Sequence, residues 1–367
     1  MNLKAGIVGL PNVGKSTIFN AITKKNALAA NYPFTTIEPN VGVVFVPDNR
    51  LDFLQEAYKT ERKIPTSFEF IDIAGLVEGA SRGEGLGNKF LSHIREVDAI
   101  VHVVRCFSDE GTTHIAGNVN PIRDIEIINT ELILADLEII ENRIERIIKK
   151  ADSTKNREDN IEKDILIRCK DALNKNKAIR ELNLTDEEKK IIKHYNFITL
   201  KPIIYAANID EEDILKTDYN EYSKQVINYA KDEGAETVVI SAILEEEIAL
   251  FDGEEKLRIM KDLGLEKSAL DNLIFSTYTL LNLATFFTAG VKEARAWTFK
   301  KGMKAPDCAE IIHSDMKRGF IRMETISFED LQKYGSELKV KEAGKLRQEG
   351  KDYITKDGDI CYFKFNV

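Results

Sequence analysis

The segment Gly9–Ser16 (GLPNVGKS) has residue types that suit a phosphate chain, and it fits G-x-x-x-x-G-K-[ST] without a mismatch. Its glycines let the backbone curl so that successive amides point at phosphate oxygens. The Lys15 ammonium would lie beside the β and γ phosphates, and the Ser16 hydroxyl would be a ligand of Mg²⁺. The residues expected to bind nucleotide here are Gly9, Asn12, Val13, Gly14, Lys15, Ser16 and Thr17.

Two further motifs could respond to a triphosphate. Asp72 ends an apolar run and begins D-x-x-G with Gly75. The acid can reach Mg²⁺ through water, and the Gly75 N–H can sense the γ phosphate. Thr35 and Thr36 lie in the loop between the motifs, where a threonine hydroxyl can complete the Mg²⁺ shell. The predicted metal ligands are therefore Ser16, Thr36 and Asp72.

The segment that would recognise the base departs from a guanine site. Such a site has Asn-Lys-x-Asp, whose Asp accepts two N–H groups of guanine, whereas this chain has Asn208-Ile209-Asp210-Glu211. Glu211 is one methylene longer than Asp, and the amide of Asn208 suits N6 and N7 of adenine. Losing a bidentate pair is worth roughly 1–3 kcal/mol in the analogous readout of base pairs. We therefore expect ATP to be preferred over GTP, with Asn208, Ile209, Glu211, Ser241 and Ala242 lining the base.

The elements that must position these residues alternate between strand and helix. Short apolar runs read as buried strands, and Lys15–Lys24 reads as a helix. This alternation predicts an α/β fold with a mostly parallel sheet. The expected strands are Leu3–Gly9, Phe68–Ile73, Ala99–Arg105, Pro202–Ala207 and Thr237–Ser241.

A helical insertion interrupts this pattern over residues 127–200. Asn129–Lys150 has helical apolar spacing without Gly or Pro, a polar hinge spans 151–160, and a second helix follows from about Ile161 to Leu182. Two long helices joined by a short turn form an αα-hairpin. Its tip could serve as a recognition surface, although no tip residue selects a partner.

After residue 280 the sequence pattern changes, and it predicts short strands separated by turns that contain glycine. We expect a first domain over 1–280, interrupted by the insertion, and a small α+β domain over 281–367. This tail has 16 Lys and Arg against 13 Asp and Glu, while the whole chain of 367 residues has a net charge of −9. The negative net charge of the whole chain argues against a protein that coats nucleic acid by charge alone.

The bulk features favour a cytoplasmic protein. No run approaches the roughly 18 apolar residues of a membrane helix, and no secretory signal is recognisable at the N-terminus. The four cysteines form no CxxC pair, so neither a zinc site nor a disulfide framework is indicated.

The ordered motifs GLPNVGKS, YPFTTIEPN, DIAGL, NIDE and SA resemble the YchF family, the Obg-like ATPases of the translation-factor-related class of P-loop GTPases. In the tail, FTAGVKE, ARAWTF, KRGFIR and EGKDY resemble the TGS domain of that family, a β-grasp-like module. The resemblance covers essentially the whole chain. It implies a G domain with a coiled-coil insertion, Mg²⁺-dependent ATP hydrolysis and association with ribosomes. The family signature NxxE is matched at Asn208 and Glu211.

One position predicts slow intrinsic hydrolysis. Many related enzymes have a glutamine directly after D-x-x-G to orient water, but this chain has Leu76. The resemblance also implies a mobile loop with a histidine, here His114, which could orient water when the loop closes. Asn12 could help coordinate K⁺. The residues assigned to catalysis are Lys15, Thr36, Gly75 and His114.

Three functions remain open at this stage. The first is an ATP-hydrolysing switch that docks on a ribosome, either on the large subunit or on the assembled particle, with rRNA contact and without a membrane. The second is a nucleotide-gated binding module with negligible turnover, which Leu76 favours, and the third is a GTP-specific translation GTPase. Lys300, Lys301 and Lys304 are compatible with RNA phosphate contact or with a solvated face. We expect a monomer.

Overall fold

The computed structural model describes residues 3–27, 40–73, 86–108, 119–151, 157–214, 216, 218–251, 253–265 and 267–366. The chain forms two compact units. The first comprises Met1–Gly42 and Glu69–Leu273, and the second comprises Val43–Phe68 and Ile274–Val367. The second unit is therefore assembled from two separate stretches of sequence.

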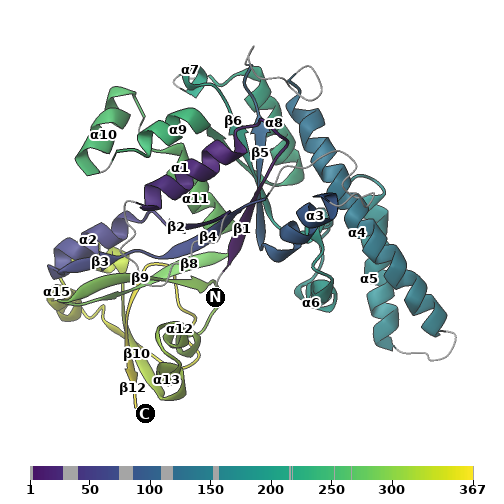
Figure 1. The fold of residues 1–367 in the computed structure, drawn as a ribbon. Coiled ribbons are helices and arrows are strands. Elements are labelled where there is room, and N and C mark those ends of the chain that lie inside the picture. The colour runs from purple at the N-terminus through teal and green to yellow at the C-terminus, as the bar shows by residue number, and fades with distance from the viewer. Residues whose placement is uncertain are drawn as a thin grey trace. The chain divides into compact units, whose positions relative to one another are not determined.

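The first unit is built on a six-stranded sheet with the order β2-β4-β1-β5-β6-β7 (Figure 1). β1 pairs in parallel with β4 and β5, and β6 pairs in parallel with β5 and β7. Every residue of β5 and β6 is buried, as expected for parallel strands covered on both faces. The bounds are β1 Lys4–Val8, β2 Val41–Phe45, β4 Ser67–Asp72, β5 Ala99–Arg105, β6 Ile203–Asn208 and β7 Glu236–Ile240.

Helices cover both faces of this sheet. α1 packs with α9, while α4 packs with α8, which also contacts β6 and β7 (Figure 1). The predicted α/β fold with a mostly parallel sheet is confirmed. The bounds are α1 Lys15–Ala27, α3 Leu86–Glu96, α7 Glu211–Ile214, α8 Glu221–Glu233, α9 Ala242–Ile248, α10 Gly253–Asp262 and α11 Ala269–Leu280.

The predicted helical insertion is present as a long arm. α4 (Pro121–Ala151) and α5 (Arg157–Leu173) lie side by side, and their buried residues form one apolar cluster that includes Ile140, Ile147 and Leu166 (Figure 1). α4 begins six residues before the expected start at 127. The return path contains η2 Ile179–Glu181, α6 Asp186–Ile192, η3 Lys193–Tyr195 and η4 Ile198–Leu200.

Asp136 of α4 fixes the base of this arm. Its carboxyl group accepts hydrogen bonds from the Ile198 N–H at 3.1 Å, the Thr199 N–H at 2.8 Å and the Thr199 hydroxyl at 2.8 Å. Arg95 of α3 lies 3.3 Å from the same carboxyl. Burial raises the pKa of Asp136, although these hydrogen bonds act to lower it. A fully buried carboxyl with this many donors is a strong local constraint.

The second unit has its own six-stranded sheet, with the order β11-β10-β12-β8-β9-β3 (Figure 1). Most of it comes from the tail, but β3 comes from residues 62–64 and pairs in parallel with β9. The strands are β3 Arg62–Ile64, β8 Leu283–Ala289, β9 Glu293–Lys300, β10 Phe320–Ser327, β11 Arg347–Glu349 and β12 Asp359–Phe365. The helices are α2 Asn49–Tyr58, α12 Ala305–Ile312, α13 Ser314–Arg318, α14 Phe328–Tyr334 and α15 Glu337–Glu342.

Residues 43–68 belong to this second unit, which differs from the expected domain over 1–280. The physical reason is a shared core: Leu51 and Leu54 of α2 are buried in one cluster with Phe287, Ile360 and other residues of the tail. The α+β character predicted for the tail is confirmed. The unit also begins earlier than expected, at Ile274.

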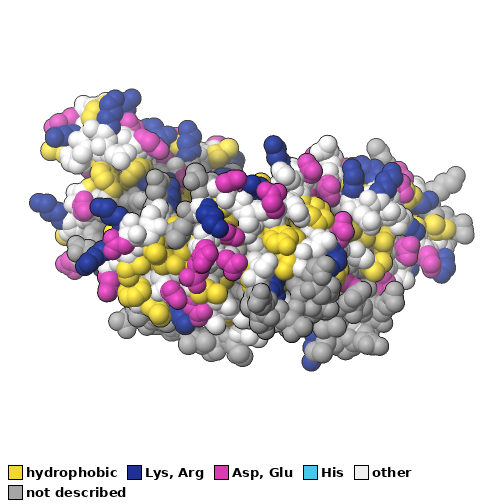
Figure 2. Space-filling view, turned by 90° about the horizontal axis from the view of Figure 1, so that it is seen from above, with side chains coloured by type: hydrophobic (Ala, Val, Ile, Leu, Met, Phe, Trp, Pro, Cys, Tyr) yellow, Lys and Arg dark blue, Asp and Glu magenta, His cyan; other side chains and the backbone are white. Residues whose placement is uncertain are grey.

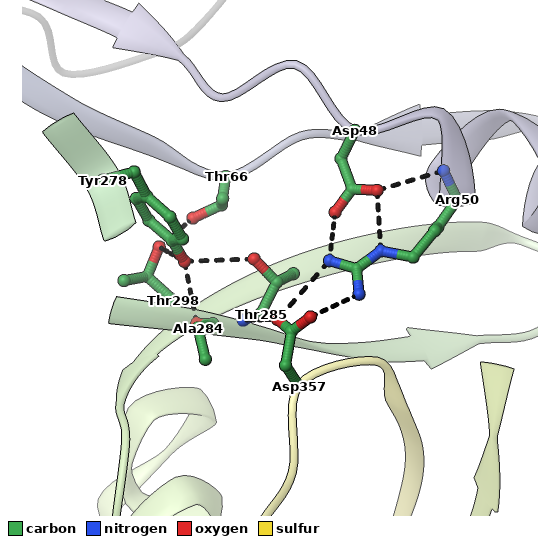
Figure 3. A network of polar contacts seen from close by, with 8 residues as sticks. All are labelled: Asp48, Arg50, Thr66, Tyr278, Ala284, Thr285, Thr298 and Asp357. Atoms are coloured by element: carbon green, nitrogen blue, oxygen red, sulfur yellow. Dashed lines mark hydrogen bonds and ion pairs between the residues drawn. The ribbon is translucent and has the colours of Figure 1, made fainter. Parts of the chain in front are cut away.

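A polar network reinforces the junction between these two stretches of the second unit (Figure 3). The Arg50 guanidinium donates to Asp48 at 2.7 Å and to Asp357 at 2.6 Å, and Asp357 accepts from the Thr285 N–H at 2.8 Å. Burial lowers the pKa of Arg50, but the hydrogen bonds that it donates to the two carboxylates raise this pKa above its usual value.

Tyr278 forms a second part of this network, in which its hydroxyl donates to the carbonyl of Ala284 at 2.7 Å (Figure 3). It also lies 3.1 Å from the Thr298 hydroxyl, which in turn contacts the Thr66 hydroxyl. Residues 48–66 are therefore joined to the tail by hydrogen bonds as well as by apolar packing.

All four cysteines are free and buried. Among the helices described, none is both long enough and apolar enough to pass through a membrane.

Candidate nucleotide-binding site

The loop between β1 and α1 has the conformation that its glycines predict. Asn12 and Gly14 both have positive φ angles, of 62° and 89°. A Cβ atom on Gly9 would lie 2.8 Å from the carbonyl oxygen of Val103, closer than real Cβ atoms approach. Both glycines are therefore required by the backbone path, one through its conformation and one through a close approach.

This loop forms one wall of a cavity of about 570 Å³ at the carboxyl edge of the sheet. Ligands of open α/β sheets bind at this edge. Five of the seven predicted loop residues line the cavity together with Asp72. The complete lining is Leu10, Pro11, Asn12, Gly14, Lys15, Ser16, Thr17, Asn40 and Asp72.

Lys15 and Asp72 form an ion pair across the cavity wall, and both side chains are largely buried. Lys15 is the first residue of α1 and Asp72 is the last residue of β4. Strand and helix therefore bring together two groups that are 57 positions apart in the chain. Each charge satisfies the other, and a bound triphosphate would compete with Asp72 for the ammonium.

Asn208, the last residue of β6, links three parts of the site. Its Nδ2 donates to the carbonyl oxygen of Val13 at 2.9 Å, and its Oδ1 accepts from the Ala242 N–H at 2.9 Å. A Cβ atom on Gly14 would lie 2.2 Å from that Nδ2. Asn208 is 4% exposed, and the two hydrogen bonds of its amide hold the phosphate loop against the start of α9.

This geometry changes the role expected of the base-recognition residues. Ser241 and Ala242 were expected to line the base through a backbone N–H, and the N–H of Ala242 donates to Asn208. Ile209 and Ser241 are buried, and the Ile209 N–H donates to the carbonyl of Ile240 at 2.9 Å. Asn208 still has one N–H that the protein does not use among the described residues, because Nδ2 carries two hydrogens. Glu211 is exposed as the first residue of α7.

Several predicted site residues lie outside the described residues. They are the threonines expected to bind metal and order the loop, the glycine expected to sense the γ phosphate, its neighbouring leucine, and the histidine expected to orient water: Thr35, Thr36, Gly75, Leu76 and His114.

Asn40 also lines the cavity, although its residue type and position did not mark it as a site residue in the sequence. It has a left-handed backbone, with φ of 78°, and its carbonyl oxygen accepts the Asp72 N–H at 2.9 Å. Asparagine is one of the few residues that adopts this conformation readily. Its place directly before the run Val41–Phe45 was the available signal, since such residues often mark turns at strand ends.

Two buried side chains, one in β5 and one directly after it, stay neutral. Burial lowers the pKa of His102 to about 3, and its ring lies 5.4 Å from that of Tyr205. Burial also raises the pKa of the Cys106 thiol. Neither group is suited to proton transfer at neutral pH.

The donor set fits Mg²⁺. The Ser16 hydroxyl and the Asp72 carboxylate line the same cavity, and hard oxygen donors of this kind hold Mg²⁺ together with waters and phosphate oxygens. Among the described residues no group of three His, Cys, Asp or Glu side chains could form a protein-only metal site.

Comparisons with known proteins agree with this geometry. Residues 4–143 match a domain family described as 50S ribosome-binding GTPase, and residues 283–366 match the C-terminal domain of YchF-type GTPases, described as a protein of unknown function. The structure of the Schizosaccharomyces pombe YchF GTPase is similar, with a TM-score of 0.90 and 40% identity, and the match covers 99% of this chain and 98% of that one.

Curated relatives match along their whole length. The proteins named "Ribosome-binding ATPase YchF" from Bacillus subtilis and Haemophilus influenzae are 55% and 53% identical to this chain, with 100% of each chain covered. The same name and 53% identity apply to the Escherichia coli O157:H7 protein. With its phosphate loop, inserted arm and C-terminal unit in the same order, this chain belongs to the YchF family.

Proposed function

We propose that this P-loop nucleoside triphosphatase is an Mg²⁺-dependent ATP-hydrolysing switch that associates with the ribosome. The observation that carries the proposal is the cavity whose wall brings together Lys15, Ser16 and Asp72. Few arrangements other than a triphosphate site need an ammonium, a hydroxyl and a carboxylate around a curled backbone at a helix N-terminus.

Each residue has a distinct task in this proposal. Lys15 leaves Asp72 and moves to the β and γ phosphates, while the amides of the loop and the N-terminus of α1 bind the remaining negative charge. Ser16, Thr36 and Asp72 would hold Mg²⁺, which would neutralise charge that develops on the phosphate oxygens. The Gly75 N–H senses the γ phosphate.

Hydrolysis is slow without a further group, because Leu76 cannot hydrogen-bond water. His114 orients the attacking water in this proposal. The test is single-turnover hydrolysis by His114→Ala with His93→Ala as the control, since His93 is an exposed histidine of α3. An unchanged rate for His114→Ala, with unchanged ATP affinity, removes His114 from the mechanism.

The proposed preference for ATP rests on position 211. The free N–H of Asn208 can donate to N7, which adenine and guanine share, so Asn208 alone does not discriminate between them. Glu211 cannot place its carboxylate where an Asp would accept the two guanine N–H groups. We expect Glu211→Asp to improve GTP affinity relative to ATP by about 30-fold, which corresponds to about 2 kcal/mol, the middle of the range for one bidentate pair.

Side-by-side titration with ATP and GTP tests this preference, and Glu212→Asp is the matched control on the same exposed helix. Tighter binding of GTP than ATP by the unaltered protein would leave the third function, a GTP-specific translation GTPase, as the better one.

Association with a ribosome is supported by the names of the curated relatives. Basic and acidic side chains are interspersed on the face drawn in Figure 2. Lys300 and Lys301 are exposed, whereas Lys304 pairs with Asp352 at 2.7 Å. Contact with rRNA through Lys300 and Lys301, a cytoplasmic location and a monomeric state complete the proposal.

Co-sedimentation with ribosomes in the ATP and ADP states, measured beside turnover, tests the switch. Binding that changes with nucleotide but without measurable hydrolysis would favour the nucleotide-gated binding module instead. Lys15→Ala should abolish both the nucleotide effect and turnover. Comparing hydrolysis in potassium and sodium buffers tests the proposed K⁺ contact of Asn12, whose backbone is left-handed at φ of 62°.

A further inference from the structure

Asn40 has a left-handed backbone conformation at the wall of the phosphate cavity. Its φ of 78° lies in the left-handed region, and the side chain is exposed, so no burial of the side chain accounts for the conformation. Six non-glycine residues among those described have a positive φ. Of these six, Asn12 and Asn40 line the cavity. Such backbone strain persists where the surroundings fix it, and it concentrates at functional sites.

The left-handed turn gives Asn40 a specific partner. Its carbonyl oxygen accepts the Asp72 N–H at 2.9 Å, and the next amide, that of Ile73, donates to the carbonyl of Ile7 at 3.2 Å. The backbone at Asp72 is thus held from two sides, by Asn40 and by β1. Asp72 is the residue whose carboxylate pairs with Lys15.

The turn at Asn40 is constrained because Gly42, two residues later, packs closely against α1. A Cβ atom on Gly42 would lie 2.7 Å from Cγ2 of Thr23 and 3.2 Å from the ring of Phe19. The start of β2 is therefore in close contact with the helix that carries Lys15 and Ser16. Asn40 lies in the chain directly before this contact with α1, and its carbonyl oxygen binds the Asp72 N–H. Its backbone conformation therefore affects the position of Asp72 relative to α1.

We propose that Asn40 is a positioning residue of the nucleotide site. Its left-handed backbone sets the main chain of Asp72, and through it the direction of the carboxylate toward Lys15 and the metal position. This inference rests on the proposed function, since it assumes that Asp72 reaches Mg²⁺. It goes beyond that function by adding a residue that acts through its backbone and touches neither metal nor phosphate.

The residue type follows from the backbone. Glycine adopts positive φ without strain, and asparagine tolerates it, whereas a β-branched residue is a genuine outlier there. Asn40→Gly should keep the carbonyl on the Asp72 N–H. Asn40→Val should leave the left-handed region and withdraw the carbonyl from Asp72.

The matched control is Asn176→Val. Asn176 is also exposed and has φ of 56°, but it lies at the turn after α5, far along the chain from the cavity-lining residues. Its replacement imposes the same backbone strain without touching the Asn40–Asp72 hydrogen bond. Both valine variants should lose a similar amount of thermal stability.

Two measurements on the full-length protein test the inference. The first is amide hydrogen exchange at Asp72 in nucleotide-free protein, followed by NMR, with the Ile73 amide as internal reference. The second is the Mg²⁺ concentration that gives half of the metal-dependent gain in ATP affinity. We expect Asn40→Val to speed exchange at Asp72 by at least about tenfold and to raise the Mg²⁺ requirement by about tenfold, the order expected for one strained residue. Asn40→Gly and Asn176→Val should match the unaltered protein in both.

The outcomes separate this inference from the proposed function. If Asn40→Val behaves like Asn176→Val while Asp72→Asn raises the Mg²⁺ requirement, the role of Asn40 is overturned and the proposed function stands. If Asp72→Asn itself leaves the Mg²⁺ requirement unchanged, the metal role of Asp72 is overturned and the inference falls with it.

Discussion

The side-chain amide of Asn208 donates to the carbonyl oxygen of Val13 at 2.9 Å, and this bond joins the end of β6 to the phosphate loop. The same amide accepts from Ala242 at the start of α9. Asn208 therefore determines how the phosphate loop and the base-recognition segments meet, whichever purine is bound.

The first prediction follows from this position. Asn208→Ala should weaken ATP and GTP binding by similar factors of about tenfold, because the lost bonds support the loop and the shared N7 position rather than one base. Calorimetric titration with both nucleotides measures the two factors. Asn129→Ala is the control, since the Asn129 amide donates to Tyr229 at 3.1 Å away from the cavity-lining residues. A loss confined to ATP would show that Asn208 itself reads adenine.

Gly14 and Asn208 should be energetically coupled. Alanine at position 14 places a Cβ 2.2 Å from the Asn208 Nδ2 and also strains a backbone with φ of 89°. Gly234→Ala isolates the second effect, because Gly234 has φ of 76° and an added Cβ there would meet no described atom within 4 Å. We expect Gly234→Ala to cost about 1 kcal/mol and Gly14→Ala to cost more.

A double-mutant cycle measures the coupling by chemical denaturation. Gly14→Ala should be less damaging in an Asn208→Ala background, where the clash is absent, with a coupling of at least about 0.5 kcal/mol. Additive effects of the two substitutions would show that Asn208 moves aside without cost.

His102 should make the fold less stable in mild acid. Its pKa is lowered by burial to about 3 in the folded protein, against 6.5 for an ordinary histidine. The unfolded chain therefore takes up a proton that the folded chain does not, so the free energy of unfolding falls as the pH drops below about 6.5. Between pH 7 and pH 5 the loss from this residue is about 2 kcal/mol.

Denaturation curves at several pH values check the contribution of His102. His102→Leu should remove about one proton from the pH dependence between about pH 4 and 6, while His93→Gln, at an exposed site, should keep the original dependence. An unaltered slope in His102→Leu would assign the acid sensitivity to other groups.

Leu54 should stabilise the second unit although it lies far from the tail in sequence. It is fully buried in the cluster that contains Phe287 and Ile360, so Leu54→Ala should lower the free energy of unfolding of this unit by about 3 kcal/mol. Trp297, the single tryptophan, lies in β9 of the same unit and reports its unfolding by fluorescence. Leu338→Ala, at a site 67% exposed in α15, should change little. Equal effects of the two would argue against the shared core.

The sequence was sufficient for features whose information is local. The phosphate loop could be predicted because its motif lies within one short segment, with Gly9, Gly14, Lys15 and Ser16. The arm could be predicted because apolar residues repeat at helical spacing along two segments. The prediction that the end of β6 recognises the base likewise rests on a local pattern, that of Asn208 and Glu211.

The remaining features depend on contacts between distant positions. Nothing near Asn208 shows that its amide would reach Val13, 195 positions away. Leu51 and Leu54 have ordinary helical spacing, and only the packed structure reveals that their partners are in the tail. The role proposed for Asn40 depends on its backbone conformation, and its place before Val41–Phe45 indicates a turn without distinguishing it from other residues near turns.

The excursion Val43–Phe68 means that the two units are not consecutive modules that recombination or protein engineering could exchange at one junction. A chain shortened to end near residue 280 would keep α2 but lose the residues that bury Leu51 and Leu54. Its apolar helix face would then be open to solvent, which favours aggregation. A clean separation of the nucleotide unit would require replacing residues 46–66, which connect β2 to β4, by a short turn.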